Sequence, residues 1–380
     1  MQKQKLYYYT STDTMSKILQ NGNIWATNLE YMNDSREYLN GIQEIRKLVT
    51  SPSITAKWFE SKQKKKEYEE YPLKDIFSER NGKEKQDMSS RYTISFCRKK
   101  DLLSQWTTYA KESGVCLEMA FDLDKDGEYL LHNKGQKDQE SRDISVTKEL
   151  KEIYYFTRER NEKEKYQETA EKILMELFGE NAENLDKDSL LERWAQISIY
   201  VKQYDFYQEE EVRLAFDTME VNSETGKQPR IGYRMDKHVL KPYLDVQCKD
   251  GWPVISVMVG PGSNQDVVYK SIKFFLDHEE IMSSALVTDE QWKEQIKSYL
   301  CSNRTINLLW KKLERGNVQS DSPIKRLYEH WKMFSMDSRE DIMSDIEEVI
   351  KQSNYNSYYK NRYFTRSGIV VEKSSIPYIY

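Results

Sequence analysis

The chain has 380 residues and is 38% hydrophobic, which is enough to bury a sizeable core in one large domain or two ordinary ones. Its 58 Lys and Arg residues against 63 Asp and Glu residues give a formal net charge of −5, so no global positive field draws it to nucleic acid or to an anionic membrane. No window approaches the roughly 18 apolar residues of a membrane-spanning helix, and the N-terminus lacks the apolar stretch of a signal peptide. We therefore expect a cytoplasmic protein that does not contact membranes.

Cysteine and histidine, the usual ligands of structural zinc, are scarce and scattered in this sequence. The four cysteines form no CxxC pair, and the four histidines are neither at HxxxH spacing nor close to a cysteine. Because the cysteines mostly sit inside apolar runs, we expect free thiols that pack as small hydrophobic groups in a reducing compartment. The sequence therefore predicts no metal site.

The first fifty residues predict two strands that alternate with two helices. Residues 6–10 are aromatic and β-prone, and Ser11 to Asp13 supply N-cap groups for a helix with one apolar face. Residues 24–27 predict a second strand, and the polar stretch 31–37 opens the second helix. The order at the N-terminus is therefore β-α-β-α.

The rest of the chain mixes strands with long helical blocks. Residues 57–90, which include the run Lys62 to Lys66, are charge-dense and predict an exposed excursion. The period of the apolar positions predicts the other elements, namely strands at 92–97, 114–121, 211–216, 239–244, 254–261 and in the tail after 368, and helices near 102–109, 147–179, 190–200 and throughout 264–352.

Three adjacent carboxylates, Glu209, Glu210 and Glu211, stand directly ahead of a predicted strand. Like charges side by side repel, so either the cluster is a solvated turn or one carboxylate has a function. In the strand, Glu211 and Arg213 share one face, while the apolar even-numbered residues share the other. We therefore expect Glu211 and Arg213 to point together into a cleft. The alternative is a solvated strand entry with a cross-strand ion pair.

Several short motifs, taken in order along the chain, resemble those of one bacterial protein family. They are residues 6–11 with Ile24, Trp25 and the stretch from Asn33 to Glu37; Ser95 and Phe96 with Trp106, Tyr109 and residues 114–116; residues 206–213; Gly260 with Pro261; and the closing residues 375–378. In this order and spacing the chain resembles the DUF2971 family, which is placed with the ADP-ribosyltransferase-like folds. The resemblance covers most of residues 1–125, 200–277 and 365–380.

The resemblance implies an α+β fold with an ADP-ribosyltransferase-like split β-sheet core and large helical insertions. We expect this core in residues 1–277 with a helical insertion at about 123–203, a helical insertion or subdomain at 278–360, and a C-terminal strand at 361–380 that returns to the core. The implied activity is transfer of ADP-ribose from NAD+ to a nucleic acid or a protein, by a bacterial toxin or anti-phage defence effector. The helical blocks would dock the target, a cognate inhibitor or another partner.

The resemblance also implies the roles of individual residues. ADP-ribosyl transfer passes through an oxocarbenium-like transition state, which needs a carboxylate beneath the developing positive charge. Glu211 is the expected catalytic residue, and Glu209 on the same side is the expected general base. The residues expected to hold NAD+ are Tyr8, Tyr9, Thr10, Trp25, Ser95 and Arg213. Where this chain has Tyr8, the family often has histidine, so that contact would come from Tyr8 or Thr10.

Other interpretations stay open at the level of sequence. The replacement at Tyr8 fits a catalytically inactive module that binds a nucleotide or a protein. The acidic cluster with Arg213 fits a metal-dependent nuclease, which would need Mg2+ and ignore NAD+. Trp25 and Trp106 are also typical of core aromatic residues that bind no ligand.

Overall fold

The structure is a computed structural model that describes residues 3–32, 36–64, 73, 76, 88–110, 114–123, 125–134, 144–156, 163–179, 186–236, 238–279, 281, 289–316, 322–333, 339–352, 361–365 and 367–376. It is a mixed α/β protein, which confirms the coarse prediction of fold class. The chain divides into two compact units. The first unit combines residues 1–23, 99–122 and 248–380, and the second combines residues 24–98 and 123–247.

The described strands of the first unit form a mixed sheet in the order β14-β15-β13-β4-β1. Neighbouring strands are antiparallel except β13 and β15, which run parallel. The strands are β1 (Gln4–Ser11), β4 (Gly114–Phe121), β13 (Val254–Val259), β14 (Arg362–Phe364) and β15 (Val370–Lys373). β4 is buried along almost its whole length, as expected of a continuous apolar run that is covered on both faces.

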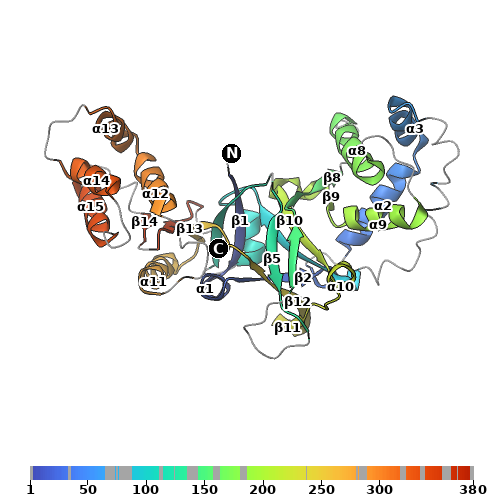
Figure 1. Ribbon diagram of the computed structural model, residues 1–380, viewed down its shortest axis with the longest axis horizontal. Coiled ribbons are helices and arrows are strands. Elements are labelled where there is room, and N and C mark those ends of the chain that lie inside the picture. The colour runs from blue at the N-terminus through green and yellow to red at the C-terminus, as the bar shows by residue number, and fades with distance from the viewer. Residues whose placement is uncertain are drawn as a thin grey trace. The chain divides into compact units, whose positions relative to one another are not determined.

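Helices of the first unit contact this sheet and form a block near the C-terminus (Figure 1). α1 (Thr12–Asn21) begins where Ser11 Oγ accepts a hydrogen bond from the Thr14 N–H (3.1 Å), and it ends at Gly22, whose φ of 71° favours glycine. The other helices are α7 (Leu103–Gln105), which continues as a π-helical turn at Trp106–Ala110, α11 (Gln265–His278), α12 (Asp289–Cys301), α13 (Arg304–Glu314), α14 (Pro323–Lys332) and α15 (Arg339–Gln352). Helices α12 to α15 pack in sequence order, around a core that includes Trp292, Trp310, Leu327 and Ile342.

The described strands of the second unit form a sheet in the order β7-β10-β3-β2-β12-β5-β6, with β11 added to β12. The strands are β2 (Asn23–Asn28), β3 (Arg91–Cys97), β5 (Gly127–Leu131), β6 (Ile144–Lys148), β7 (Lys151–Glu152), β10 (Glu211–Asp217), β11 (Ile231–Asp236) and β12 (Val239–Cys248). A separate parallel pair is formed by β8 (Tyr154–Phe156) and β9 (Val201–Gln203).

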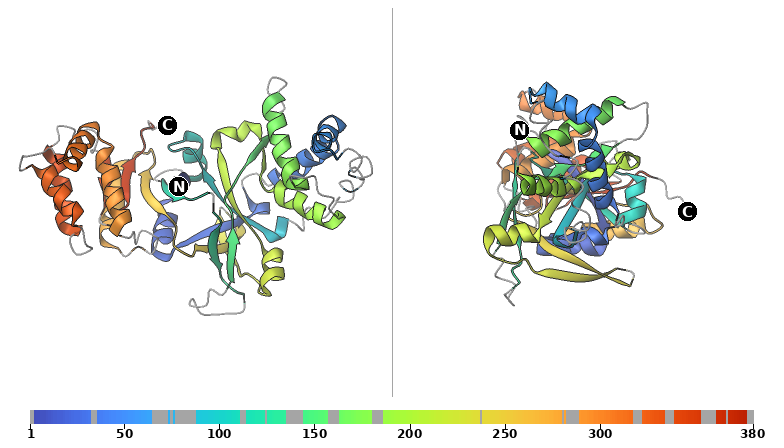
Figure 2. Two further views of the ribbon diagram at one scale, coloured as in Figure 1. Left: turned by 45° about the horizontal axis from the view of Figure 1, so that its top comes forward. Right: turned by 90° about the vertical axis from the view of Figure 1, so that its right-hand side faces the viewer.

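Four helices of the second unit gather around a core of their own, and they stay together in both views of Figure 2. They are α2 (Glu37–Val49), α3 (Pro52–Ser61), α8 (Lys163–Phe178) and α9 (Lys187–Ser198). The ring of Phe59 contacts those of Trp58 and Phe178 edge to face, with centroids 5.2 and 5.0 Å apart. Shorter elements are η1 (Leu29–Tyr31), η4 (Tyr204–Glu209) and α10 (Thr218–Thr225).

The predicted helical insertion at about 123–203 is only partly helical. α8 and α9 lie in it, but the described residues of 127–156 form strands, so the helix predicted from residue 147 begins at residue 163. The physical reason is a period of two: Ile144 and Val146 are buried while Ser145 and Thr147 are exposed. That pattern is short and is followed by irregularly spaced apolar residues, a spacing that also fits a helix.

The other helices and strands predicted in the described residues are present. The prediction of an exposed excursion at 57–90 is wrong where the structure describes it, because Trp58, Phe59, Leu73, Ile76 and Met88 are buried in the core of the second unit. The helical block at 264–352, the tail strand and the strands near 92, 114, 211, 239 and 254 are confirmed. Asn33 and Asp34, most of the charge-dense stretch and the last two lysines of the Lys62 to Lys66 run lie outside the described residues. Where the structure describes helices, none has the length and apolar character that a bilayer crossing requires.

Candidate functional site

Strand β10 carries the acidic residue that the sequence singles out. It runs antiparallel to β3, with Glu211 opposite Cys97 and Arg213 opposite Ser95. Its apolar even-numbered residues are buried in the core, as predicted. The opposite face is not an open cleft, however, because the side chains of Glu211 and Arg213 are only 7% and 2% exposed. β10 is therefore covered on both faces at this end.

Glu211 and Arg213 form a close ion pair inside the second unit. Arg213 Nε donates to Glu211 Oε1 at 2.6 Å, and its Nη2 donates to Glu211 Oε2 at 3.1 Å and to Glu37 Oε1. The remaining nitrogen, Nη1, donates to the backbone carbonyl of Ile199 at 2.6 Å. All three nitrogen atoms of the guanidinium group are thus engaged, which fixes both side chains.

A second cation, Lys202, holds the acidic residues together. Its Nζ lies 2.7 Å from Glu209 Oε2, 2.9 Å from Glu211 Oε2 and 3.4 Å from Glu37 Oε2. It also lies 4.9 Å from the centre of the Phe206 ring, within range of a cation–π contact. The ammonium group is therefore enclosed by three carboxylates and one aromatic ring. We call Lys202, Glu37, Glu209, Glu211, Phe206 and the paired Arg213 the lysine cage.

The cage has more negative than positive charge. Glu37, Glu209 and Glu211 contribute three carboxylates, while Lys202 and Arg213 contribute two cations. A buried excess charge is costly unless it is neutralised by a proton or by another cation. The cage is therefore suited either to bind a proton or to stabilise positive charge that develops beside it.

The two carboxylates nearest to Lys202 differ in their protonation behaviour. Burial opposes ionisation of Glu211, but Arg213 and Lys202 outweigh it and hold its pKa well below the ordinary value. Burial raises the pKa of Glu209, and the attraction of Lys202 does not cancel this effect. Burial lowers the pKa of Lys202, but Glu211 and Glu37 outweigh it, so the net shift is upward and the ammonium stays charged. Two carboxylates with opposite shifts beside one cation are typical of an acid–base pair.

Ser95 and Trp25 lie on the same side of the sheet as this cage. Ser95 is near enough to Glu211 to lower its pKa, although its hydroxyl makes no hydrogen bond of good geometry. Thr27 pairs with Thr93, so alternation along β2 and β3 places Trp25 on the face of Ser95. The Trp25 ring stacks on Tyr243 with centroids 4.5 Å apart, so part of the expected ligand wall is already occupied by protein.

The N-terminal residues predicted to hold NAD+ belong to the first unit. Tyr9 is buried, and its hydroxyl donates to the Lys99 carbonyl (3.1 Å) and accepts from the Leu102 N–H (3.0 Å). Thr10 is buried as well, whereas Tyr8 is half-buried. Tyr9 therefore fixes the segment that follows β3, and Tyr8 is the more accessible of the three to a ligand.

Sequence analysis misses two members of the lysine cage, Lys202 and Glu37. Glu37 is 176 positions from Arg213 along the chain, and it stands at the start of α2, where it looks like an ordinary first-turn carboxylate. Lys202 lies in the short strand β9, in a part of the sequence that contains many other charged residues. No local pattern connects either residue with β10, so only the fold identifies them.

A cavity of about 450 Å³ lies beside the cage in the second unit. Ala215 and Asp217 line it from the face of β10 that carries Glu211 and Arg213, and Ile199, whose carbonyl binds Arg213, lines it too. Ion pairs join Lys148 to Glu220 (2.7 Å), Arg91 to Asp217 (2.9 Å) and Lys151 to Glu176 along its wall. The cavity therefore has an ordered, charge-paired rim.

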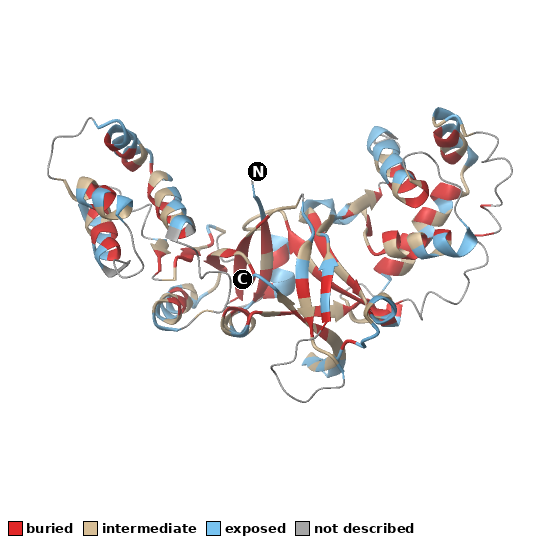
Figure 3. Ribbon diagram, viewed as in Figure 1, coloured by how far each residue is buried: buried red, intermediate tan, exposed pale blue. Residues whose placement is uncertain are grey.

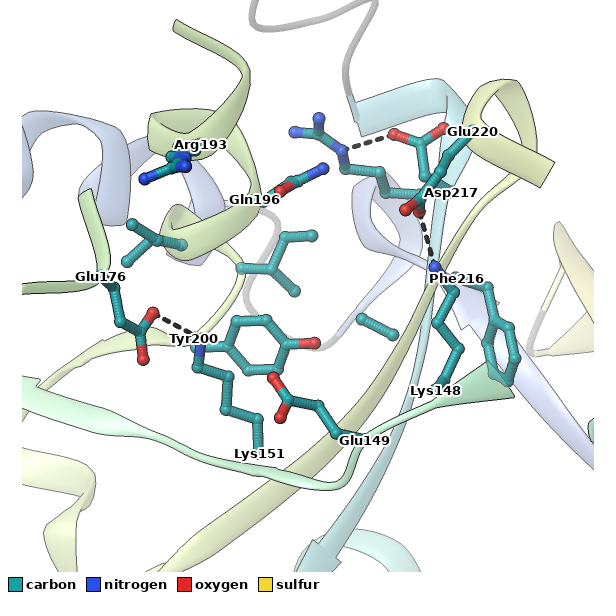
Figure 4. Close-up of a pocket in the computed structure, with 14 residues that line it drawn as sticks. Lys148, Glu149, Lys151, Glu176, Arg193, Gln196, Tyr200, Phe216, Asp217 and Glu220 are labelled. Atoms are coloured by element: carbon teal, nitrogen blue, oxygen red, sulfur yellow. Dashed lines mark hydrogen bonds and ion pairs between the residues drawn. The ribbon is translucent and has the colours of Figure 1, made fainter. Parts of the chain in front are cut away.

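Tyr200 lines this cavity, and its ring lies near the centre of the view in Figure 4. In this view Arg193 and Gln196 of α9 line the upper side of the cavity, and Glu149 and Lys151 lie below the Tyr200 ring. The Nζ of Lys151 is 5.1 Å from the ring centre. Burial, followed by the charge of Glu149, raises the pKa of Tyr200, so its hydroxyl remains a hydrogen-bond donor at neutral pH. The arrangement offers an aromatic ring with both donors and acceptors around it.

Among the described residues, no group of three or more His, Cys, Asp or Glu side chains is placed to hold a metal ion. The four cysteines are free thiols. Comparison with models of protein families, with curated proteins and with solved structures finds no match to this chain.

Proposed function

We propose that this protein transfers ADP-ribose from NAD+ to a macromolecular acceptor, nucleic acid or protein, with Glu211 as the carboxylate that stabilises the transition state. The observation that carries the proposal is the lysine cage, in which three carboxylates surround two cations. Such an excess of preorganised negative charge favours a positive charge that develops during a reaction. The role of a bacterial toxin or defence effector is part of the same proposal.

The reaction assigns different roles to the two carboxylates. The bond between nicotinamide and ribose C1 breaks, its electron pair leaves with nicotinamide, and the ribose becomes oxocarbenium-like. Glu211 remains ionised because of its low pKa and so offers negative charge to that cation. The acceptor nucleophile then attacks C1 and gives its proton to Glu209, whose raised pKa makes it the better base. Neither step needs a metal-bound group.

Lys202 marks the place where a cation is stabilised. Its ammonium group contacts Glu209 and Glu211 directly and lies over the face of Phe206. A substrate that brings its own cationic centre would compete with Lys202 for these carboxylates. The described structure then corresponds to a resting state, in which the protein's own cation neutralises the catalytic charge.

The neighbouring cavity supports binding of a nucleotide. Its volume of about 450 Å³ lies within the range of small-molecule sites, and Tyr200 supplies a ring face with polar groups on both sides. We propose that it holds part of NAD+ and that the strands of this protein form the β-sheet core of an ADP-ribosyltransferase-like fold.

The proposal is tested by measuring nicotinamide release from NAD+ by the full chain and by Glu211→Gln. Glutamine keeps the shape of the side chain and leaves the cage with two carboxylates and two cations, so the fold is expected to persist. Turnover should fall by about 10²- to 10³-fold, the usual effect of removing one electrostatic stabiliser. The dissociation constant for NAD+, measured by calorimetry, should stay unchanged, because the lost interaction belongs to the transition state.

Glu210→Gln is the matched control, because it changes the adjacent carboxylate and leaves the three carboxylates that contact Lys202, those of Glu37, Glu209 and Glu211, in place. It should keep full turnover. Saturable NAD+ binding without nicotinamide release by the wild-type chain would instead identify a binding module without catalysis. Cleavage of nucleic acid that needs Mg2+ and is indifferent to NAD+ would identify a nuclease.

A further inference from the structure

One carboxylate on the wall of the cavity in the second unit, that of Glu149, is left over from the ion pairs. Three ion pairs, described above, engage most of the charged side chains that line the cavity. The Glu149 carboxylate forms no ion pair and no hydrogen bond within the part of the chain that the structure describes, and Glu149 is exposed. It is therefore available to a ligand that donates hydrogen bonds.

The hydroxyl of Tyr200 is a donor near this acceptor. It makes no hydrogen bond to any residue that the structure describes. Burial and then the charge of Glu149 raise the pKa of Tyr200, so the hydroxyl keeps its proton and lies within the electrostatic range of that carboxylate. A hydrogen-bond acceptor and a hydrogen-bond donor are therefore both available at the wall of one cavity.

Such a pair of groups is complementary to an edge of adenine. The exocyclic N6 amine of adenine donates hydrogen bonds, and the ring nitrogen beside it accepts them. A carboxylate only accepts, and a protonated phenol donates, so Glu149 suits the amine and Tyr200 suits the ring nitrogen. Ile197, Ile199 and Ala215 also line the cavity and offer apolar surface to a planar base.

Strand β10 relates the cavity to the site of the proposed reaction. In that reaction the ribose that carries nicotinamide lies at Glu211, near the start of the strand. Ala215 and Asp217 of the same strand line the cavity, and they are four to six residues further on, which is roughly 13–20 Å. Because nicotinamide is attached to the reacting ribose, the group of NAD+ that reaches this far is the adenine at its other end.

We propose that the cavity around Tyr200 binds the adenine base of NAD+, with Glu149 accepting a hydrogen bond from the N6 amine and the Tyr200 hydroxyl donating one to the neighbouring ring nitrogen. The identity of the ligand rests on the proposed function. The recognition of the base does not, because adenosine monophosphate (AMP) carries the same base and no nicotinamide. Glu149 and Tyr200 determine specificity and take no part in the chemical step.

Calorimetry of the full chain with AMP and with inosine monophosphate (IMP) tests this assignment. In IMP a carbonyl oxygen replaces the N6 amine and faces the Glu149 carboxylate. The wild type should bind AMP about 10- to 100-fold more tightly than IMP, the usual effect of one hydrogen bond to a charged group. In Glu149→Gln the preference should be lost, because an amide donates to a carbonyl as readily as it accepts from an amine.

Two further variants separate the hydrogen bonds from other effects. Tyr200→Phe keeps the ring and should weaken AMP binding by about 2- to 10-fold, the usual effect of one neutral hydrogen bond. Glu171→Gln is the matched control for loss of a carboxylate. Glu171 is exposed on α8, a helix that buries one side and exposes the other (Figure 3), and it does not line the cavity. This variant should keep the full preference for AMP.

A wild type that does not bind AMP, or that binds AMP and IMP equally, would overturn the proposal, as would a Glu149→Gln variant that keeps the preference. These outcomes are distinct from failure of the proposed reaction, because AMP contains no bond to nicotinamide. A chain that prefers AMP but releases no nicotinamide from NAD+ would contradict the transfer reaction alone. A chain that releases nicotinamide without preferring AMP would contradict the adenine site alone.

Discussion

Glu209 and Glu211 bind the same ammonium group of Lys202, at 2.7 and 2.9 Å, yet their pKa values move in opposite directions. Glu211 is also bound by Arg213, and this guanidinium together with Lys202 outweighs the cost of burial. Glu209 has no contact of that kind with Arg213, so burial decides its pKa. One added cation thus separates two otherwise similar carboxylates, and this separation is what an acid–base mechanism requires.

The raised pKa of Glu209 predicts how stability depends on pH. Between the unfolded value of about 4.3 and the raised folded value, the folded state binds more protons than the unfolded state. The contribution of Glu209 to the free energy of unfolding is therefore fully present below about pH 4.3 and is lost as pH rises through the folded pKa. Urea denaturation of the wild type and Glu209→Gln at several pH values should give a difference that shrinks as pH rises.

The lowered pKa of Glu211 has the opposite sign, and its contribution is lost only as pH falls toward about 2. The two effects therefore fall in separate pH ranges. A difference between wild type and Glu209→Gln that does not change from pH 4 to 8 would contradict the raised pKa.

Removal of Arg213 should destabilise the second unit strongly. Arg213→Met leaves Glu37, Glu209 and Glu211 with Lys202 as their only cation in the cage, and breaking a buried ion pair on one side costs about 3–5 kcal/mol. The measurement is the free energy of unfolding in urea. The double variant Glu211→Gln with Arg213→Met restores the original excess of one carboxylate.

The double variant should therefore be more stable than the sum of the two single changes predicts, by about 0.5–3 kcal/mol. A general packing defect at Arg213 does not produce this coupling between the two changes. Simple additivity of the two changes would mean that Arg213 acts through packing and through its bond to the Ile199 carbonyl alone.

The sequence predicts those parts of this structure that depend on local periodicity. In β10 the alternation of Val212, Leu214 and Phe216 identifies the core face, and the 3.6-residue period after residue 264 identifies the C-terminal helices. Strands β5 to β9 are not predicted from the sequence, because each is short. Their alternation spans too few residues to outweigh a stretch of charged and apolar residues that also fits a helix.

The candidate site is less predictable, because the residues that cover it come from segments that are distant in the sequence. Strand alternation places Glu211 and Arg213 on one face, but it does not say that Lys202 and Glu37 close that face. Burial of charged groups depends on partners that are brought together only by the fold. For the same reason, the sequence gives no indication of the cavity around Tyr200.

The cavity predicts a binding phenotype that is separate from catalysis. Arg193 and Gln196 of α9 line one side of the cavity, so Arg193→Gln removes one positive charge from that side while keeping a polar side chain. We expect about tenfold weaker NAD+ binding, equivalent to about 1.4 kcal/mol. Calorimetry gives the dissociation constant. Arg304→Gln, in α13 of the first unit, serves as the control for loss of one arginine charge. Equal affinities of the two variants for NAD+ would exclude the cavity as the NAD+ site.

Asp101 holds the C-terminal segment of the first unit in place. Its carboxylate accepts hydrogen bonds from the Trp106 indole (2.9 Å), the Ser374 hydroxyl, and both the backbone N–H and the hydroxyl of Ser375 (3.0 Å each). Asp101 has a φ of 59°, in the left-handed region that asparagine also tolerates. Asp101→Asn therefore keeps the backbone conformation and removes the charge.

The loss of these charge-assisted hydrogen bonds should cost about 1.5–3 kcal/mol of local stability. Amide hydrogen exchange measures it at Ser375 and Ile376, whose N–H groups bond to Asp101 and to Ser374 Oγ. Exchange there should accelerate by about tenfold or more, while the amides of β4 in the same unit keep their rates. Acceleration of both segments alike would mean that Asp101 stabilises the whole unit, and unchanged rates in both would mean that β15 alone holds the tail.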